Sequence, residues 1–266
     1  MKTAIKLVLI YFVCQILGVF LAMIPAVLIV LLKHGDMAEI NSLSLAPSML
    51  IGFLLMFSYL YKTGYISKSK KTWSFVSLDY LLYSSIMALS AIFLIDYLMS
   101  FMSWLPDWME DSFDALQAGS LGIICIALLG PILEELLFRG AVTKILLQKY
   151  TPTKAIFLSA LIFGIFHLNP AQIVGAGLMG VILAWIYYKT ASLIPCILMH
   201  VINNSLSVYL NIKYPDANYT EDILGSNYYI WLLLAGVLFL STFLLMNKRI
   251  FASEWKENIM GNNDMN

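Results

Sequence analysis

The chain has 266 residues, of which 61% are hydrophobic and only 12% are charged, and its formal net charge is zero. Soluble domains carry about 25% charged residues, so this composition excludes an ordinary soluble protein and indicates an integral membrane protein. The balanced charge gives no reason to expect nucleic acid as a partner, and the lipid bilayer is the expected environment. The three cysteines lie singly in apolar stretches, which argues against a disulfide framework or a thiolate metal site.

Eight apolar stretches are candidate membrane spans, because a helix needs about 20 mostly apolar residues to cross a bilayer. In chain order they cover about residues 4–32, 45–61, 76–101, 119–138, 155–168, 171–188, 193–210 and 228–246. The first is too long for the apolar core of a signal peptide, so we interpret it as a retained span. Only Asn169 and Pro170 separate the fifth from the sixth.

The charges in the connecting loops predict how the spans are oriented, since short cytoplasmic loops are enriched in Lys and Arg. With the N-terminus inside, the inner loops contain lysines such as Lys62 and Lys149, whereas the outer loops contain acids such as Asp107 and Asp216. We therefore predict that both termini are cytoplasmic. Lys outnumbers Arg by fourteen to two, a bias typical of AT-rich bacterial genomes, so the expected location is a bacterial plasma membrane.

The predicted fold is all-α: a polytopic bundle of about eight transmembrane helices that forms one membrane domain over residues 1–250. Residues 251–266 are expected to form a polar C-terminal tail. The outer segment around Trp104 and Trp108 has apolar residues at helical spacing opposite its acids. That pattern predicts an amphipathic helix in the membrane interface.

Ionisable residues inside the predicted spans are the first functional signal, because a charge in the bilayer is costly and usually faces the protein interior. These residues are Glu134, Glu135, Arg139, His167, His200, Asp79 and Asp96. The two aspartates fall near the ends of the third span, where water is close, so we interpret them as interfacial. The others call for a chemical explanation.

The two adjacent glutamates are expected to have different roles. Glu135 and Arg139 are four residues apart, so they share a helix face and are predicted to form an ion pair. Glu134 is rotated by about 100° from Glu135, since a helix has ~3.6 residues per turn. We therefore predict that Glu134 points away from the pair and is available for chemistry.

The same four-residue spacing recurs around the two histidines of the spans. Phe163 and His167 share one face of the fifth span, and His200 and Asn204 share one face of the seventh. A carboxylate and an imidazole can remove a proton from water, while an imidazole and a carboxamide can stabilise an oxyanion. Alternatively, Glu134, His167 and His200 could bind catalytic Zn²⁺ or another divalent metal, with water in the open position. Both routes lead to hydrolysis of an amide in or beside a membrane.

Three short motifs resemble those of a known family. EELLFR, FGIFH and HVINN follow the patterns EExxxR, FxxxH and HxxxN, in this order and in separate spans. They resemble the CPBP (CAAX protease and bacteriocin-processing, Abi) family of intramembrane proteases, which contains the type II CAAX prenyl endopeptidases and bacterial proteins of bacteriocin processing and self-immunity. The resemblance covers residues 119–210, the motif-bearing half, whereas residues 1–118 match no motif.

The resemblance implies a role for each motif residue. Glu134 would be the general base that activates water together with His167, and His200 and Asn204 would form the oxyanion hole. Structural support would come from three further residues, namely Glu135, Arg139 and Phe163. The resemblance leaves metal dependence open.

The resemblance also implies an activity, that of an intramembrane endopeptidase. Its substrate would be a membrane-associated protein or peptide, such as a prenylated protein or a bacteriocin or pheromone precursor. One alternative is a non-catalytic immunity or partner-binding membrane protein that keeps the motifs for stability. Another is a transporter or ion pathway that uses the same buried charges.

The fourth span must extend further than its apolar core for these residues to meet. If it ended at Phe138, Glu134 would lie near the cytoplasm and His167 toward the outside. A helix that continues through residues 141–150 brings Glu134 nearer the midplane, so we predict a long or kinked fourth helix. Three glycines in the sixth span spell GxGxxG without the strand that a dinucleotide site requires, and we interpret them as small residues for close helix packing.

Overall fold

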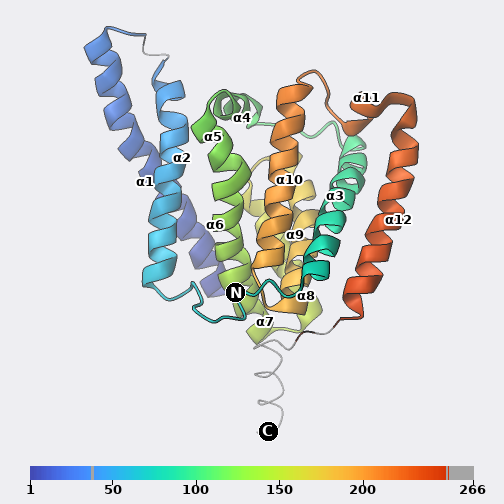
Figure 1. The fold of residues 1–266 in the computed structure, drawn as a ribbon. Coiled ribbons are helices and arrows are strands. Elements are labelled where there is room, and N and C mark those ends of the chain that lie inside the picture. Colours follow the sequence, from blue (N-terminus) through green and yellow to red (C-terminus); the bar gives the residue numbers. More distant parts are fainter. Residues whose placement is uncertain (37–38, 250, 252–266) are drawn as a thin grey trace.

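The computed structural model describes residues 1–36, 39–249 and 251, and over these residues it is a bundle of helices without a strand (Figure 1). The all-α prediction is therefore confirmed. The predicted polar tail at 251–266 lies outside the described residues, apart from Phe251.

Along the chain, the elements are α1 (Lys2–Lys33), α2 (Glu39–Lys62), α3 (Leu78–Ser100), α4 (Glu110–Gln117), α5 (Ser120–Ile124), η1 (Cys125–Leu129), α6 (Gly130–Leu137), η2 (Phe138–Thr143), α7 (Lys144–Lys149), α8 (Pro152–Phe166), α9 (Pro170–Thr190), α10 (Ile194–Lys213), α11 (Thr220–Leu224), η3 (Gly225–Asn227) and α12 (Tyr228–Asn247).

Each predicted span corresponds to a helix or to a run of helices, but not all of them qualify as membrane spans. Within the described residues, six helical stretches are long and apolar enough to cross a bilayer. The apolar helix α8 is too short, with 15 residues, and α10 is not among the six. Polar residues such as His200, Asn203 and Asn204 explain the lower apolarity of α10. The count of eight spans and the cytoplasmic placement of both termini stay predictions.

The fourth span is a 30-residue rod from Ser120 to Lys149, which confirms the predicted long helix. It includes two π-helical segments, η1 and η2, on either side of α6. Pro131 lies two residues after the end of η1 and has no N–H for a helical hydrogen bond, which favours an irregular turn there. Single π-helical turns are frequent at functional sites. The rod carries the first motif in its middle.

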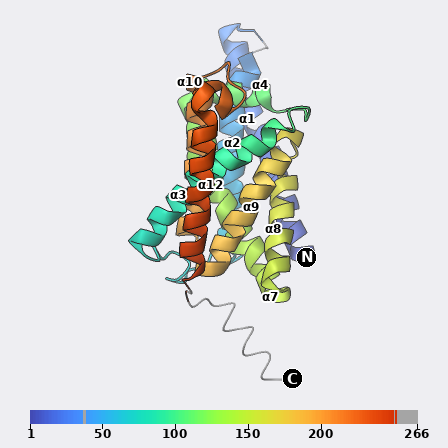
Figure 2. The same cartoon turned by 90° about the vertical axis from the view of Figure 1, so that its right-hand side faces the viewer.

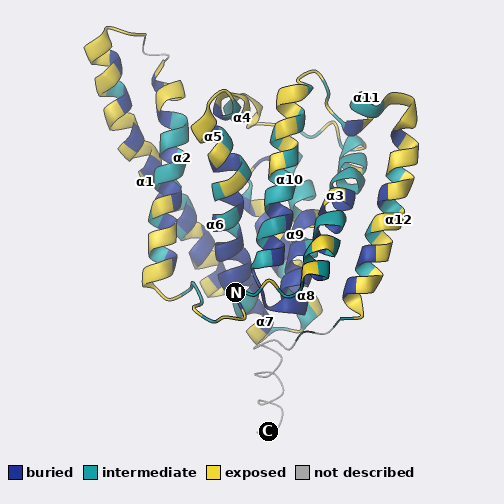
Figure 3. Cartoon of the chain, in the orientation of Figure 1, coloured by how far each residue is buried: buried dark blue, intermediate teal, exposed yellow. Residues whose placement is uncertain are grey.

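The rod lies at the centre of the bundle, and this position explains its burial. In its most apolar window 61% of residues are buried, against 17% for the stretch that ends in α12. Buried residues gather on the rod and on α8, α9 and α10 (Figure 3). Helices α3 and α12 pack together on the side of the bundle away from α1 and α2 (Figure 2).

The α1–α2 hairpin is a peripheral unit that projects from one side of the bundle (Figure 1). The N-terminal half of α1 joins the main core through residues such as Leu7 and Tyr11. Its C-terminal half packs in a separate small cluster in which Ala26 and Val30 meet Ile40 of α2. The hairpin therefore has an anchored half near the rod and an outer half with little contact to it.

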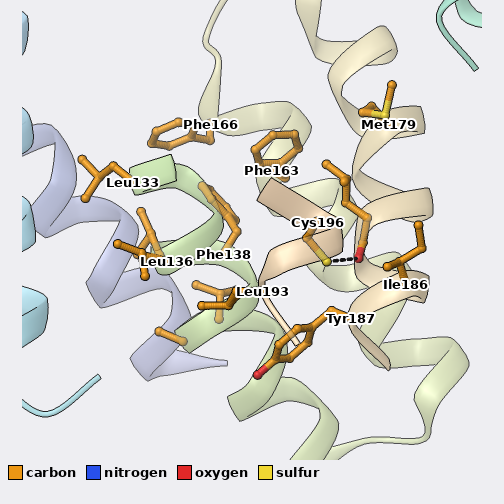
Figure 4. Packing of buried hydrophobic residues seen from close by; sticks show 14 of the residues in the cluster. Leu133, Leu136, Phe138, Phe163, Phe166, Met179, Ile186, Tyr187, Leu193 and Cys196 are labelled. Atoms are coloured by element: carbon orange, nitrogen blue, oxygen red, sulfur yellow. Dashed lines mark hydrogen bonds between the residues drawn. The ribbon is translucent and has the colours of Figure 1, made fainter. Parts of the chain in front are cut away.

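Aromatic and aliphatic side chains from several helices interlock next to the motifs (Figure 4). Phe138 at the start of η2 stacks edge-to-face on Phe163 and Phe166 of α8. A Cβ atom at Gly180 of α9 would lie only 3.0 Å from the Phe163 ring and 3.2 Å from the Cα of Ala160. A larger residue would thus push α9 away from α8, which confirms the packing interpretation of this glycine.

The outer segment before the rod differs in part from the prediction. Only α4, Glu110–Gln117, is α-helical, and Trp104 and Trp108 lie in the turns before it, 73% and 69% exposed. Pro106 disfavours helical backbone in the residue before it and cannot donate a hydrogen bond itself. The predicted helix is therefore confirmed for residues 110–117 and wrong for residues 104–109, and its place in the membrane interface stays a prediction.

Candidate active site

The predicted ion pair of the first motif is present at the centre of the rod. Arg139 Nη1 donates to Glu135 Oε1 at 2.8 Å, and both side chains are fully buried. Glu135 lies in α6 and Arg139 in the π-helical η2. The four-residue spacing places both groups on one face although the helix changes its pitch between them. Because an unpaired charge is very costly in this environment, each residue makes the burial of the other possible.

Arg139 has two further partners, and both come from other helices. Its Nη2 donates to the carbonyl oxygen of Gly180 in α9 at 3.2 Å. Its guanidinium lies over the Phe163 ring of α8, 4.5 Å from the ring centre, within the range of a cation–π contact. One arginine thus ties three helices together, and Phe163 occupies the supporting position that the sequence predicted.

Glu135 connects the first motif to the third. Its Oε1 atom also lies 2.8 Å from His200 Nδ1 of α10. Since Glu135 is paired with Arg139 and acts as a carboxylate, the imidazole Nδ1 is the donor in this bond. The sequence predicted Glu135 only as the partner of Arg139, because nothing local relates it to a residue 65 positions away. The bond fixes the His200 ring and directs its Nε2 atom away from Glu135.

Glu134 turns away from the pair, as its rotation on the helix predicted. Its side chain is 15% exposed, and its Oε2 atom lies 3.8 Å from His200 Nε2. This oxygen is buried and has no hydrogen-bond partner in the part of the chain that the structure describes. The two glutamates therefore face opposite nitrogens of the same imidazole, one bonded to it and one just beyond hydrogen-bond distance.

His167 of the second motif is the C-cap residue of α8, and its own helix fixes its ring. Its Nδ1 lies 2.9 Å from the carbonyl oxygen of Phe163. The Phe163 ring stands edge-to-face to both histidines, with centroid distances of 4.9 Å to His167 and 5.7 Å to His200. No hydrogen bond or ion pair joins His167 to Glu134 among the described residues. The structure pairs Glu134 with His200 more closely than with His167.

Asn204 lies one turn beyond His200 on α10 and anchors that helix to the rod. Its Nδ2 donates to the carbonyl oxygen of Ile126 at 2.9 Å, and its Oδ1 accepts from Asn203 at 3.0 Å. Ile126 belongs to the π-helical segment η1. A sequence motif could not reveal this partner, because the acceptor is a backbone atom and does not depend on residue type.

Both motif histidines have Nδ1 bonded to an acceptor, which leaves Nε2 for a proton, a substrate or a metal. In the described part of the chain, no three His, Cys, Asp or Glu side chains form a group that could hold a metal ion. Of the three expected ligands, Glu134 and His200 approach each other, while His167 has no bond to either. The steps proposed below therefore use the side chains of the chain alone, and metal dependence stays an untested expectation.

Tyr11 of α1 is a neighbour of the site that sequence reasoning missed, because the N-terminal half carries no motif. Its ring packs edge-to-face on Phe166 with centroids 4.7 Å apart. It also lies close enough to Glu134 for the two side chains to interact electrostatically. The anchored half of the hairpin thus lies beside the site.

Comparison with known proteins agrees with the motifs. Residues 117–206 match the family model described as type II CAAX prenyl endopeptidase Rce1-like. A curated relative in Bacillus subtilis (strain 168), described as "Putative membrane peptidase YdiL", is 33% identical over 108 residues, which are 41% of this chain and 44% of the relative. No solved structure matches the chain. The segment that carries the three motifs is therefore similar to the Rce1-like family, which confirms the resemblance to the CPBP family.

Proposed function

We propose that the chain is an intramembrane endopeptidase that hydrolyses a peptide bond with water activated by Glu134. The observation that carries the proposal is the position of Glu134. Both glutamates have an Oε2 atom without a hydrogen-bond partner among the described residues, but only Glu134 lies outside the buried pair, with its side chain 15% exposed and its Oε2 atom 3.8 Å from His200 Nε2. A buried polar atom without a partner costs free energy, so its retention calls for an explanation. Binding and deprotonating water provides one.

In the first step Glu134 takes a proton from water, and the water oxygen forms a bond to the carbonyl carbon of the peptide. The electron pair of the C=O bond moves onto its oxygen and creates the oxyanion of a tetrahedral intermediate. When this intermediate collapses, the C–N bond breaks and the proton held by Glu134 goes to the leaving nitrogen. His167, whose Nε2 atom is left available by its bond to Phe163, would assist these proton transfers.

The oxyanion would be stabilised by His200 and Asn204. If His200 is protonated, its charge and that of Arg139 balance the two glutamates of the cluster, and its Nε2 atom has a proton to donate. Asn204 has two amide protons, and the bond to Ile126 uses one of them. Loss of one oxyanion donor from an enzyme costs about 10²–10³ in kcat.

The substrate is proposed to be a membrane-associated protein or peptide, cleaved in a bacterial plasma membrane. The name of the matching family supports a prenylated CAAX protein as substrate, and the name of the relative supports a peptidase. For a bacterium, which the excess of Lys over Arg favours because it is typical of AT-rich bacterial genomes, we favour the processing of a peptide precursor or a membrane protein over CAAX removal.

The test uses purified wild-type protein and Glu134→Gln in liposomes. Each is incubated with a farnesylated CAAX peptide, the same peptide without the lipid, and precursor peptides encoded by genes next to this one, and products are identified by mass spectrometry. We expect cleavage of one probe by the wild type only. Equal cleavage by Glu134→Gln would overturn the mechanism. If neither protein cleaves, and Glu134→Ala cells keep bacteriocin protection at normal protein levels, the non-catalytic alternative holds.

A further inference from the structure

Asn169 is fully buried between α8 and α9, yet its side chain does not cap the helix that it precedes. Asparagine is among the preferred N-cap residues because its side chain can accept a bond from the first helical turn. Here the side chain is used for contacts with a distant part of the chain. Its position, two residues after His167, makes those contacts relevant to the site.

Three hydrogen bonds tie this turn to the outer segment before α4. Asn169 Oδ1 accepts the backbone N–H of Trp108 at 3.0 Å, and Asn169 Nδ2 donates to Asp107 Oδ1 at 2.8 Å. The backbone N–H of Ala171 donates to the Pro106 carbonyl oxygen at 3.3 Å. The Asp107 carboxylate is itself held by the Met109 N–H at 2.9 Å. We refer to Asp107, Trp108 and Asn169 as the outer clamp.

The turn held by the outer clamp is strained and directly follows His167. Leu168 has a φ of 54°, in the left-handed region that costs a residue with a side chain on the order of 1–3 kcal/mol. His167 is the C-cap residue of α8. Its bond to the Phe163 carbonyl orients the ring from the helix side, whereas no further turn of α8 holds its backbone on the C-terminal side. Strained backbone persists only where its surroundings hold it in place, and the outer clamp supplies such contacts on the C-terminal side of Leu168.

We infer that Asn169 is a positioning residue: through Asp107 and Trp108 it holds the turn that aims His167 at the site. The outer segment, for which the sequence predicted an amphipathic helix in the membrane interface, thereby supports the position of a residue of the site. The effect on His167 geometry is independent of the proposed function, whereas the effect on turnover rests on it. A displacement of about 1 Å in a catalytic group can lower a rate by about 10²-fold.

The experiment exploits the small number of histidines, which are His34, His167 and His200. Full-length protein in detergent is labelled with ¹⁵N in the imidazole rings, and His167→Gln identifies the His167 signals. In Asn169→Ala and Asp107→Ala we expect these signals to shift or broaden while those of His200 keep their positions. With a cleavable probe, kcat should fall at least tenfold and KM should change less than twofold. Asp107→Asn keeps an acceptor oxygen for Asn169 and should restore both the spectrum and the rate.

Asn211→Ala is the matched control, because Asn211 Nδ2 of α10 also donates to an aspartate of the outer segment, Asp114, at 3.3 Å. That bond is exposed and does not involve the turn after His167, so the variant should keep the wild-type spectrum and rate. Unchanged His167 signals in Asn169→Ala and Asp107→Ala would overturn the inference, as would an equal disturbance in Asn211→Ala. If the His167 signals shift in Asn169→Ala but the wild type cleaves no probe, the result supports the positioning and counts against the proposed function.

Discussion

Two arginine–carboxylate pairs occupy opposite environments in this bundle. Arg139 and Glu135 are fully buried at its centre, whereas Arg249 and Asp79 meet where α12 has ended and α3 begins, with side chains 38% and 44% exposed. The same chemistry serves different purposes in the two places. Water can solvate either partner of the exposed pair when the other is removed, whereas it cannot reach either partner of the central pair.

The central pair also has more partners on other helices than the exposed pair of Arg249 and Asp79. Glu135 Oε1 is shared between Arg139 and His200, and Arg139 reaches a carbonyl of α9 and a ring of α8. A change at the centre therefore disturbs several helices and the proposed oxyanion donor together.

Glu134→Gln should separate chemistry from stability. Removal of the general base is expected to lower kcat by about 10²–10⁴-fold, while the folded protein stays as stable as the wild type, since Glu134 is not part of the buried pair. Steady-state cleavage and thermal unfolding in detergent measure the two quantities. The companion variant Glu135→Gln should unfold at a lower temperature than Glu134→Gln, and the reverse order would contradict the division of roles.

Arg139→Met should cause the largest loss of stability. It leaves the carboxylate of Glu135 buried without its cationic partner, a change that costs about 3–5 kcal/mol in proteins where a buried pair has been broken. Denaturant titration of the purified protein in detergent micelles gives the free energy of unfolding. Arg249→Met is the matched control at the exposed pair, and a similar loss in both variants would show that burial does not set the difference.

Lys189→Met should have a smaller effect at the end of α12. The Lys189 ammonium of α9 donates to the backbone oxygen of Asn247 at 2.8 Å and to its side-chain oxygen at 3.1 Å. A cation there also complements the negative end of the helix dipole. We expect a loss of about 1–2 kcal/mol in the same titration. Lys213→Met, at the exposed end of α10, should not change stability, and equal effects would reject this assignment.

Asp79→Asn should produce the smallest effect. Exposed ion pairs contribute little, because water and salt replace them. The unfolding temperature in 150 mM salt, on the order of physiological ionic strength, should match that of the wild type within error. Lowering the salt tenfold should reveal any remaining contribution. A loss as large as that of Arg139→Met would remove the distinction between the centre and the edge of the bundle.

The sequence alone predicted the features that depend on neighbours along the chain. Apolar length located the helices, Pro170 separated α8 from α9, and the spacing of Glu135 and Arg139 predicted their ion pair. These predictions succeed because the helical period and the chemistry of proline act over only a few residues. This reasoning reaches its limit at α10. It was predicted as a span, but it is not among the six described stretches that are long and apolar enough to cross a membrane, because several of its polar residues serve tertiary contacts.

Only the tertiary structure decided how the three motifs meet. The bond from His200 to Glu135 joins residues 65 positions apart, that from Asn204 to the Ile126 carbonyl spans 78, and that from Asn169 to Asp107 spans 62. Such contacts depend on how each helix is rotated and placed against its neighbours, which is set by packing over the whole bundle. The sequence identified residues able to perform hydrolysis, and the packing of the helices determined which of them face one another.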